Sequence, residues 1–215
     1  MKKNVLAKVS TVALHTLGLA VLSIATLGIS SQAQAGLATS LMQDSSVIKP
    51  GSYEIKFQGD IIFNGGGGFE ISPHFRFGLD EQLWDVDTYF GVGKIDFVIG
   101  AMAKFNLLPD IEGQAGLSFL GGIGYMRDET VSNAVISLGV LVSKEFQADF
   151  GTVTPYSALM PELYIRAKNS SVPTSLVLGS RWSLDTIKSW NFYSELSFSF
   201  YKSNFYLALG AGYPF

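Results

Sequence analysis

Hydrophobic and polar residues alternate along most of this chain with a period of two. The clearest example runs from Tyr53 to Phe63, where the odd positions are apolar or Gly. The even positions between them are polar up to residue 60: Glu54, Lys56, Gln58 and Asp60. A period of two sends successive side chains to opposite faces of a strand, whereas a helix repeats every ~3.6 residues. The segment is therefore predicted to be a β-strand with one apolar and one charged face.

Ten segments show this alternation, and clusters of Gly, Asp, Asn and Pro separate them. The expected strands are 52–63, 68–79, 84–92, 95–106, 114–126, 134–145, 152–165, 174–184, 191–201 and 204–215. The whole of 52–215 is expected to form one all-β domain. Eight strands are the alternative, if two of the segments stay outside the wall.

The size of the side chains indicates which face points inward. The apolar face carries Phe, Leu, Ile or Trp on nearly every segment, which is too much bulk for a narrow bore. The opposite face carries small residues besides the charges, as at Gly116, Ser118, Gly122 and Gly124. Small residues suit a crowded barrel interior, so we expect the apolar face to contact lipid and the polar face to line the lumen. A soluble β-protein with reversed faces is the alternative.

The apolar runs after residue 35 are too short to span a membrane as helices. The longest are Ala134–Val142 and Phe97–Phe105, well below the ~20 residues that a transmembrane helix needs. Strands satisfy all their backbone hydrogen bonds within lipid only when the sheet closes on itself. The expected fold is therefore a closed, antiparallel, up-and-down transmembrane β-barrel of about ten strands.

The N-terminus has the three parts of a secretory signal peptide. Three Lys residues within the first eight positions precede an apolar stretch over 12–29. Ala33, Gln34 and Ala35 then supply the small residues of a cleavage site, so we expect residues 1–35 to be removed. An uncleaved membrane anchor is the alternative. The chain has no Cys, which excludes a lipid-anchored N-terminus, a disulfide and a thiolate metal site.

The last predicted strand ends on an aromatic residue. One of its faces is apolar throughout: Phe205, Leu207, Leu209, Ala211, Tyr213 and Phe215. This pattern resembles the C-terminal insertion signal of bacterial outer-membrane β-barrel proteins, and with the signal peptide and the strands the resemblance covers nearly the whole chain. It implies a Gram-negative outer-membrane location in contact with outer-membrane lipid. It also implies the barrel-assembly machinery and periplasmic chaperones as partners during biogenesis. Residues 36–51, which lack clean alternation, would then be a periplasmic tail or a plug of the barrel mouth.

The charges of the polar faces are expected to meet inside the barrel as a lumen charge cluster. Its predicted members are Glu54, Lys56, Asp60, Arg76, Asp85, Asp87, Asp96, Lys104, Arg181 and Glu195. A charge without a partner is costly in a narrow, poorly hydrated lumen, whereas paired and hydrogen-bonded charges are tolerable. The charges therefore either pair with one another and plug the bore, or form a charged constriction that gates small solutes.

Three hairpin registers follow from the loop lengths. A four-residue loop at 80–83 predicts the pairs Leu79–Trp84, Phe77–Val86 and Arg76–Asp87. A two-residue turn at 93–94 predicts Phe90–Phe97. A seven-residue loop at 185–191 predicts Leu178–Phe198 and Arg181–Glu195. All three registers keep apolar residues opposite apolar residues. A shift by two would preserve the faces but break the pairs.

One constellation could support catalysis. After removal of residues 1–35 the only His is His74, with Ser72 on the same face and Asp60 facing them from the first strand. Residues two apart along a strand are separated by ~6.5–7 Å, which is too far for a hydrogen bond between a base and a nucleophile. We therefore expect no enzyme activity, and a lipid-modifying enzyme centred on His74 is kept only as a third hypothesis.

The acidic residues and the net charge limit which ligands the chain is expected to bind. Asp85, Asp87 and Asp96 do not offer the six or more oxygens that a Ca²⁺ site needs, and we expect neither metal nor cofactor. Removal of residues 1–35 leaves a net charge of −6, which argues against nucleic acid as a partner. The first functional hypothesis is a structural or interaction protein with a charge-paired, largely plugged lumen. The second is a narrow, porin-like channel for small solutes or ions.

Overall fold

The computed structural model describes residues 40–63, 67–80, 83–128, 131–166, 170–187, 189–201 and 205–215. The predicted signal peptide (1–35) and the first residues of the N-terminal segment (36–39) lie outside this part of the chain. Among the described residues, no helix is both long and apolar enough to span a membrane.

Ten long strands build the wall of the described structure. They are β1 (Tyr53–Ile62), β2 (Gly68–Asp80), β3 (Trp84–Gly93), β4 (Phe97–Leu108), β5 (Gly116–Asp128), β6 (Val131–Ser143), β8 (Gly151–Ile165), β10 (Thr174–Leu184), β11 (Asn191–Tyr201) and β12 (Tyr206–Pro214). Two short strands, β7 (Phe146–Ala148) and β9 (Ser170–Ser171), pair with β8, and a 3-10 turn (Asp185–Ile187) follows β10. The prediction of ten strands rather than eight is confirmed.

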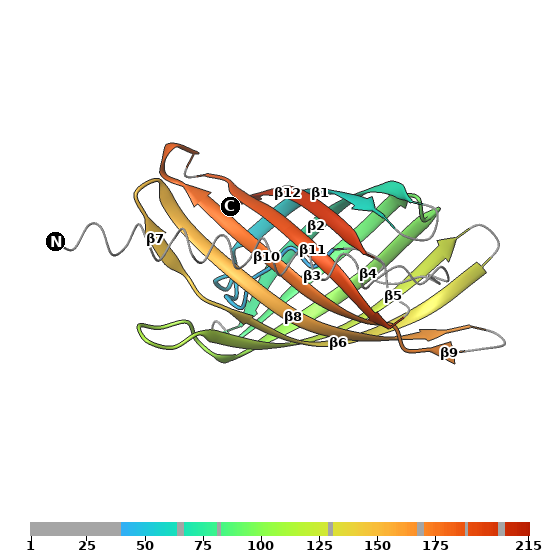
Figure 1. The fold of residues 1–215 in the computed structure, drawn as a ribbon. Helices are drawn as coiled ribbons and strands as arrows, with labels where there is room; N and C mark the ends of the chain where they lie inside the picture. The colour runs from blue at the N-terminus through green and yellow to red at the C-terminus, as the bar shows by residue number, and fades with distance from the viewer. Residues whose placement is uncertain are drawn as a thin grey trace. The chain divides into compact units, whose positions relative to one another are not determined.

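Each wall strand pairs antiparallel with the next, and β12 pairs with β1, which closes the sheet (Figure 1). In the closing ladder Ile61 lies opposite Leu207. The N–H groups of Tyr53 and Phe215 each donate to the other residue's carbonyl oxygen at 2.8 Å. Closure removes the unpaired edges that a sheet cannot expose to lipid. The expected all-β, closed, antiparallel, up-and-down barrel is confirmed.

The two faces of the wall are those that the alternation predicts. Every wall strand exposes large apolar side chains outside; Phe57 is 58% exposed, Ile123 68% and Leu209 58%. The lumenal side chains are enclosed, and Lys56 and Lys104 are both 0% exposed. Exposing apolar surface to water costs about 25 cal/mol per Å², and contact with lipid avoids this cost. The distribution of side chains is that of a transmembrane barrel and contradicts the reversed, soluble alternative.

One predicted hairpin register is largely correct. Between β2 and β3, Phe77 lies opposite Val86, and Arg76 opposite Asp87, as expected. A β-bulge between Gly78 and Asp80 then pairs Trp84 with Asp80 instead of Leu79. The bulge adds one residue to β2 at the barrel rim, where such irregularities are common.

The other two registers are wrong by two residues. The observed pairs are Phe90–Ile99, Leu178–Leu196 and Gly179–Glu195 in place of Phe90–Phe97, Leu178–Phe198 and Arg181–Glu195. A shift by two leaves each side chain on its predicted face. The face assignment is therefore correct although these pairs are not.

The turn between β3 and β4 accounts for one shift and for one error in the predicted cluster. The N–H of Lys94 donates to the carbonyl of Phe69 in β2 at 2.8 Å, so the turn contacts the neighbouring strand instead of closing after two residues. Ile95 turns inward, is 4% exposed and packs in an apolar lumenal cluster. Asp96, predicted to line the lumen, is instead exposed in this turn.

Candidate functional site

Residues 40–48 form an irregular segment within the barrel, here called the plug (blue in Figure 1). Its inner part, 40–45, is at most 3% exposed, because the wall encloses it. Beyond the plug the chain reaches the barrel end at which Tyr53 pairs with Phe215, and Pro50 forms an isolated β-bridge with Gly78 there. The described part of residues 36–51 therefore begins within the lumen.

Glu195 of β11 is the first anchor of the plug. Its carboxylate accepts hydrogen bonds from the N–H groups of Leu41 and Met42 at 2.8 and 2.7 Å. The hydroxyls of Tyr156 and Tyr206, on β8 and β12, donate to the same carboxylate at 2.7 Å. Met42 has a φ of +41°, a left-handed conformation that lets successive N–H groups converge on one anion. The anchor thus satisfies two buried backbone donors and a buried charge together.

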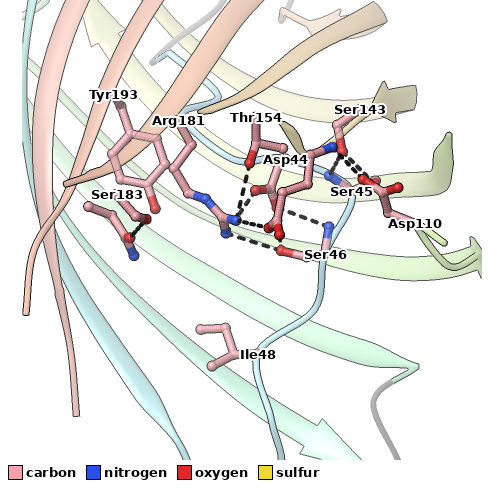
Figure 2. Close-up of polar contacts among 12 residues, drawn as sticks. Asp44, Ser45, Ser46, Ile48, Asp110, Ser143, Thr154, Arg181, Ser183 and Tyr193 are labelled. Atoms are coloured by element: carbon pink, nitrogen blue, oxygen red, sulfur yellow. Dashed lines mark hydrogen bonds and ion pairs between the residues drawn. The ribbon is translucent and has the colours of Figure 1, made fainter. Parts of the chain in front are cut away.

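Arg181 of β10 is the second anchor (Figure 2). Its Nη1 lies 2.8 Å from Oδ2 of Asp44, and its guanidinium donates to Ser46 Oγ and Thr154 Oγ1, both at 3.3 Å. Burial raises the pKa of Asp44, but the nearby cations, Arg181 foremost, outweigh burial and hold that pKa below its ordinary value of 3.8. The plug therefore presents an ionised carboxylate to the wall at neutral pH.

Three further cations bind carbonyl oxygens of the plug. Lys104 and Arg76 both donate to the carbonyl of Ser46, Arg76 at 2.6 Å. Lys56 donates to the carbonyl of Met42 at 3.3 Å. An irregular segment has no strand ladder, so its buried carbonyl groups depend on donors of this kind.

The same cations are neutralised by carboxylates of the wall. Lys56 forms an ion pair with Asp87, and Lys104 lies 3.4 Å from Asp85. Arg76 contacts Asp85 through Nε, at 3.1 Å, and through Nη2. These charges are paired and hydrogen-bonded, which is the arrangement that a low-dielectric lumen tolerates.

Nine of the ten predicted cluster members line the lumen, and Asp96 does not. Eight are at most 3% exposed: Glu54, Lys56, Asp60, Arg76, Asp85, Asp87, Lys104 and Glu195. The side chain of Arg181 is 17% exposed. The partners differ from the predicted ones, since Arg76 binds Asp85 and Arg181 binds Asp44. Asp85 is a diagonal neighbour of Arg76 on the adjacent strand, which a long Arg side chain reaches as easily as the residue directly opposite. Arg181 lies opposite Tyr193 instead of Glu195 and binds the plug.

The predicted lumen charge cluster does not include three carboxylates that the structure places in the lumen. Asp44 belongs to the plug, whose irregular backbone leaves no alternation to read. Glu70 and Glu162 lie on β2 and β8 and are 1% and 3% exposed. The alternation does place Glu70 on the polar face, which it shares with His74, although the predicted cluster does not include it.

The candidate catalytic residues have separate partners. Ser72 donates to Glu70 at 3.4 Å, His74 Nδ1 lies 3.1 Å from Asp87, and Asp60 accepts from Ser40 at 3.0 Å. No Ser–His–Asp relay is assembled among these residues. Among the residues that the structure describes, no group of three or more His, Asp or Glu side chains is placed to hold a metal ion.

Two cavities flank the outer part of the plug. One, of about 610 Å³, is lined by Asp44, Asp110, Lys144 and Arg181, among others. The other, of about 410 Å³, includes Glu54 and Arg76 in its lining. Both contact residues 46–47, so the plug separates two vestibules.

Comparison with known proteins gives structural neighbours only. No protein-family model and no curated protein sequence matches the chain. Similar solved structures include a de novo designed transmembrane β-barrel, at 12% identity and a TM-score of 0.38, covering 79% of this chain and 99% of that chain. The β-domain of the Bordetella autotransporter BrkA is 10% identical with a TM-score of 0.41, and the match covers 76% of this chain and 97% of that chain. The translocator domain of the autotransporter NalP from Neisseria meningitidis is 13% identical with a TM-score of 0.36, and the match covers 75% of this chain and 86% of that chain.

The fold assignment rests on the strand pairing and the two faces of the wall. The sheet closes between β12 and β1, large apolar side chains cover its outside, and its inside carries buried charged residues, including the ion pairs Lys56–Asp87 and Arg76–Asp85. The chain has the fold of a bacterial outer-membrane β-barrel protein.

Proposed function

We propose that the protein is a small outer-membrane β-barrel whose lumen is closed by its own plug, and that it serves as a structural or interaction protein. Export would remove residues 1–35, and insertion would proceed through 205–215 at the barrel-assembly machinery. The apolar outer wall supports a bilayer location, because only lipid leaves such a surface without an unfavourable contact with water. We propose no catalytic role for His74, and His74→Ala should leave the lipid composition of the membrane unchanged.

The fixation of the plug by Glu195 carries the proposal. One carboxylate receives four hydrogen bonds, two of them from the plug backbone. Hydrogen bonds to a charged group contribute about 1.5–3 kcal/mol each, and releasing the plug would leave Glu195 with two fewer donors. A plug held in this way favours a closed bore at rest.

Single-channel recording in planar lipid bilayers tests the closed bore. We expect the full chain to insert without current steps, and a variant lacking residues 40–48 to conduct. Glu195→Gln should open intermittently, because an amide offers one acceptor oxygen where the carboxylate offers two. Glu112→Gln, at the exposed rim, is the matched control and should stay closed. Regular steps from the unaltered protein at low applied voltage would contradict the closed lumen.

A narrow, porin-like channel is the second candidate. The two vestibules beside residues 46–47 support it, because displacement of the plug would join them to the rest of the bore. Brief current steps of the unaltered protein that appear only at high applied voltage would favour this gated alternative.

The outer-membrane location has its own test. A closed barrel resists detergent until it is heated, so we expect the extracted protein to migrate faster on a gel before boiling than after. An unshifted band, together with recovery in the soluble periplasmic fraction, would contradict the proposed location.

A further inference from the structure

The lumenal carboxylates fall into a paired and an unpaired group. The lumenal cations Lys56, Arg76, Lys104 and Arg181 form their ion pairs with Asp44, Glu54, Asp85, Asp87 and Glu145. Among the other buried carboxylates, Glu195 has no ion pair but receives four hydrogen bonds. Asp60, Glu70 and Glu162 are also at most 3% exposed, and no cation among the described residues lies within ion-pair distance of them. These three residues are here called the acidic cluster.

Two members of the acidic cluster lie on neighbouring strands of the wall, and Glu162 lies on β8, on the opposite side of the barrel from β2. Asp60 and Glu70 are directly opposite partners of β1 and β2. The hydroxyl of Tyr164 donates to Glu162 at 3.3 Å, and Tyr164 is also close enough to Glu70 to interact with its charge. Buried carboxylates without a cation are strongly unfavourable, so a positive group that the described residues lack would stabilise this half of the lumen.

Gln58 provides an independent sign that a donor is missing. Its side chain is 3% exposed, and its Nε2 donates to Asp60 at 3.4 Å, which places the amide at the acidic cluster. Among the residues that the structure describes, its Oε1 has no hydrogen-bond partner. A buried amide oxygen beside carboxylates calls for an N–H donor, and an ammonium group supplies three such donors together with a positive charge.

The plug leads to this position. The N–H of Ser40 lies 3.4 Å from Asp60 Oδ2, and the Ser40 hydroxyl donates to Oδ1 at 3.0 Å. The residue before Ser40 is therefore bonded to a nitrogen that already touches the acidic cluster. Gly36, which lies outside the described residues, would become the first residue after cleavage at Ala35. Four residues extend over at most about 14 Å, so chain length allows the α-amino group of Gly36 to reach Asp60 from the Ser40 nitrogen.

We propose that the acidic cluster binds an ammonium group, and that the group is the α-amino terminus created at Gly36 when the signal peptide is removed. The inference rests on the export that is part of the proposed function. Cleavage then both releases the barrel and supplies the cation that completes its lumen. A soluble primary amine has the same chemistry and is the other possible source.

Amine acetylation of the protein purified from the outer membrane tests the proposal. Mass spectrometry of the intact protein first establishes the N-terminus, which we expect to be Gly36. At neutral pH the Gly36 amine of the folded barrel should acetylate about tenfold more slowly, or slower still, than in the unfolded protein, because only local opening exposes it. Lys49 and Lys94 are exposed and should react at similar rates in both states.

Two variants and one control connect the protection to the acidic cluster. Glu70→Gln and Asp60→Asn each remove one carboxylate and should raise the acetylation rate of the folded protein several-fold. Asp110→Asn, at the mouth, removes a carboxylate that pairs with Lys144 and should leave the rate unchanged. Protection that is equal in all variants would overturn the role of the acidic cluster.

The remaining outcomes separate the two sources. A fully reactive Gly36 amine in a heat-modifiable barrel, or a different N-terminus, overturns the chain itself as the source. Ethanolamine that stabilises the unaltered barrel but not Glu70→Gln then identifies a soluble amine. If neither protection nor stabilisation is found, the ammonium site is overturned. A protein without heat-modifiable migration contradicts the proposed location instead.

Discussion

At the scale of single residues, the two anchors hold the plug by different physics. Glu195 receives neutral donors, from the backbone and from tyrosine hydroxyls. Asp44 instead depends on charge, since it lies 2.8 Å from Arg181 and its pKa is held below 3.8 by nearby cations despite burial. Protonation therefore affects the Asp44 anchor directly.

The lowered pKa fixes the direction of the pH dependence. Below the ordinary pKa of 3.8 the unfolded chain binds a proton at Asp44 that the folded chain does not bind. The free energy of unfolding therefore decreases as the pH is lowered through that range. We expect Asp44→Asn to lower the free energy of unfolding by about 3–5 kcal/mol at neutral pH, because Arg181 loses its buried partner. Urea unfolding in lipid vesicles should show this difference unchanged down to pH ~4 and shrinking below it. Asp110→Asn is the control, and a difference that already vanishes near pH ~6 would contradict the assignment.

At the scale of the strand, Gly179 of β10 shows how close packing supports the Glu195 anchor. A Cβ at this position would overlap the ring of Tyr156, whose hydroxyl donates to Glu195. Gly179→Ala should therefore displace Tyr156 and lower the free energy of unfolding by about 1–3 kcal/mol, with leakage through the bore. Gly121→Ala, where a Cβ meets no atom within 4 Å, is the matched control. Equal stability of the two variants in urea titrations would show that the ring is free to move aside.

The strands also show where sequence reasoning succeeds and where it stops. A period of two fixes which face each side chain joins, and so the alternation predicted the lipid face, the lumen and nine members of the charge cluster. It does not fix register, because a shift by two keeps both faces; hence Phe90 was placed opposite the wrong partner. The plug has no period at all. Its contacts, such as Asp44 with Arg181, arise from irregular backbone that alternation cannot describe.

At the scale of the whole molecule, the surrounding medium, water or lipid, decides whether an apolar outer wall is stable. The barrel turns its charges inward, where its cations pair with carboxylates of the wall and of the plug, and its large apolar side chains outward. In water this distribution would be unfavourable over the entire outer wall. In a bilayer, contacts between lipid tails are replaced by equally apolar contacts between lipid tails and the wall. The enclosed charges do not contact hydrocarbon.

A single substitution on the wall distinguishes these two solvents. Ile123 lies at the middle of β5 and is 68% exposed. In a soluble protein, Ile123→Lys would change the free energy of unfolding by no more than about 0.5 kcal/mol. In a bilayer it should lower that free energy by about 2–4 kcal/mol, because the ammonium would face hydrocarbon at mid-depth. Glu112→Lys, at the exposed rim, is the control and should be nearly neutral. Reversible urea unfolding in vesicles measures both variants, and a neutral effect of Ile123→Lys would show that the wall does not contact lipid at this depth.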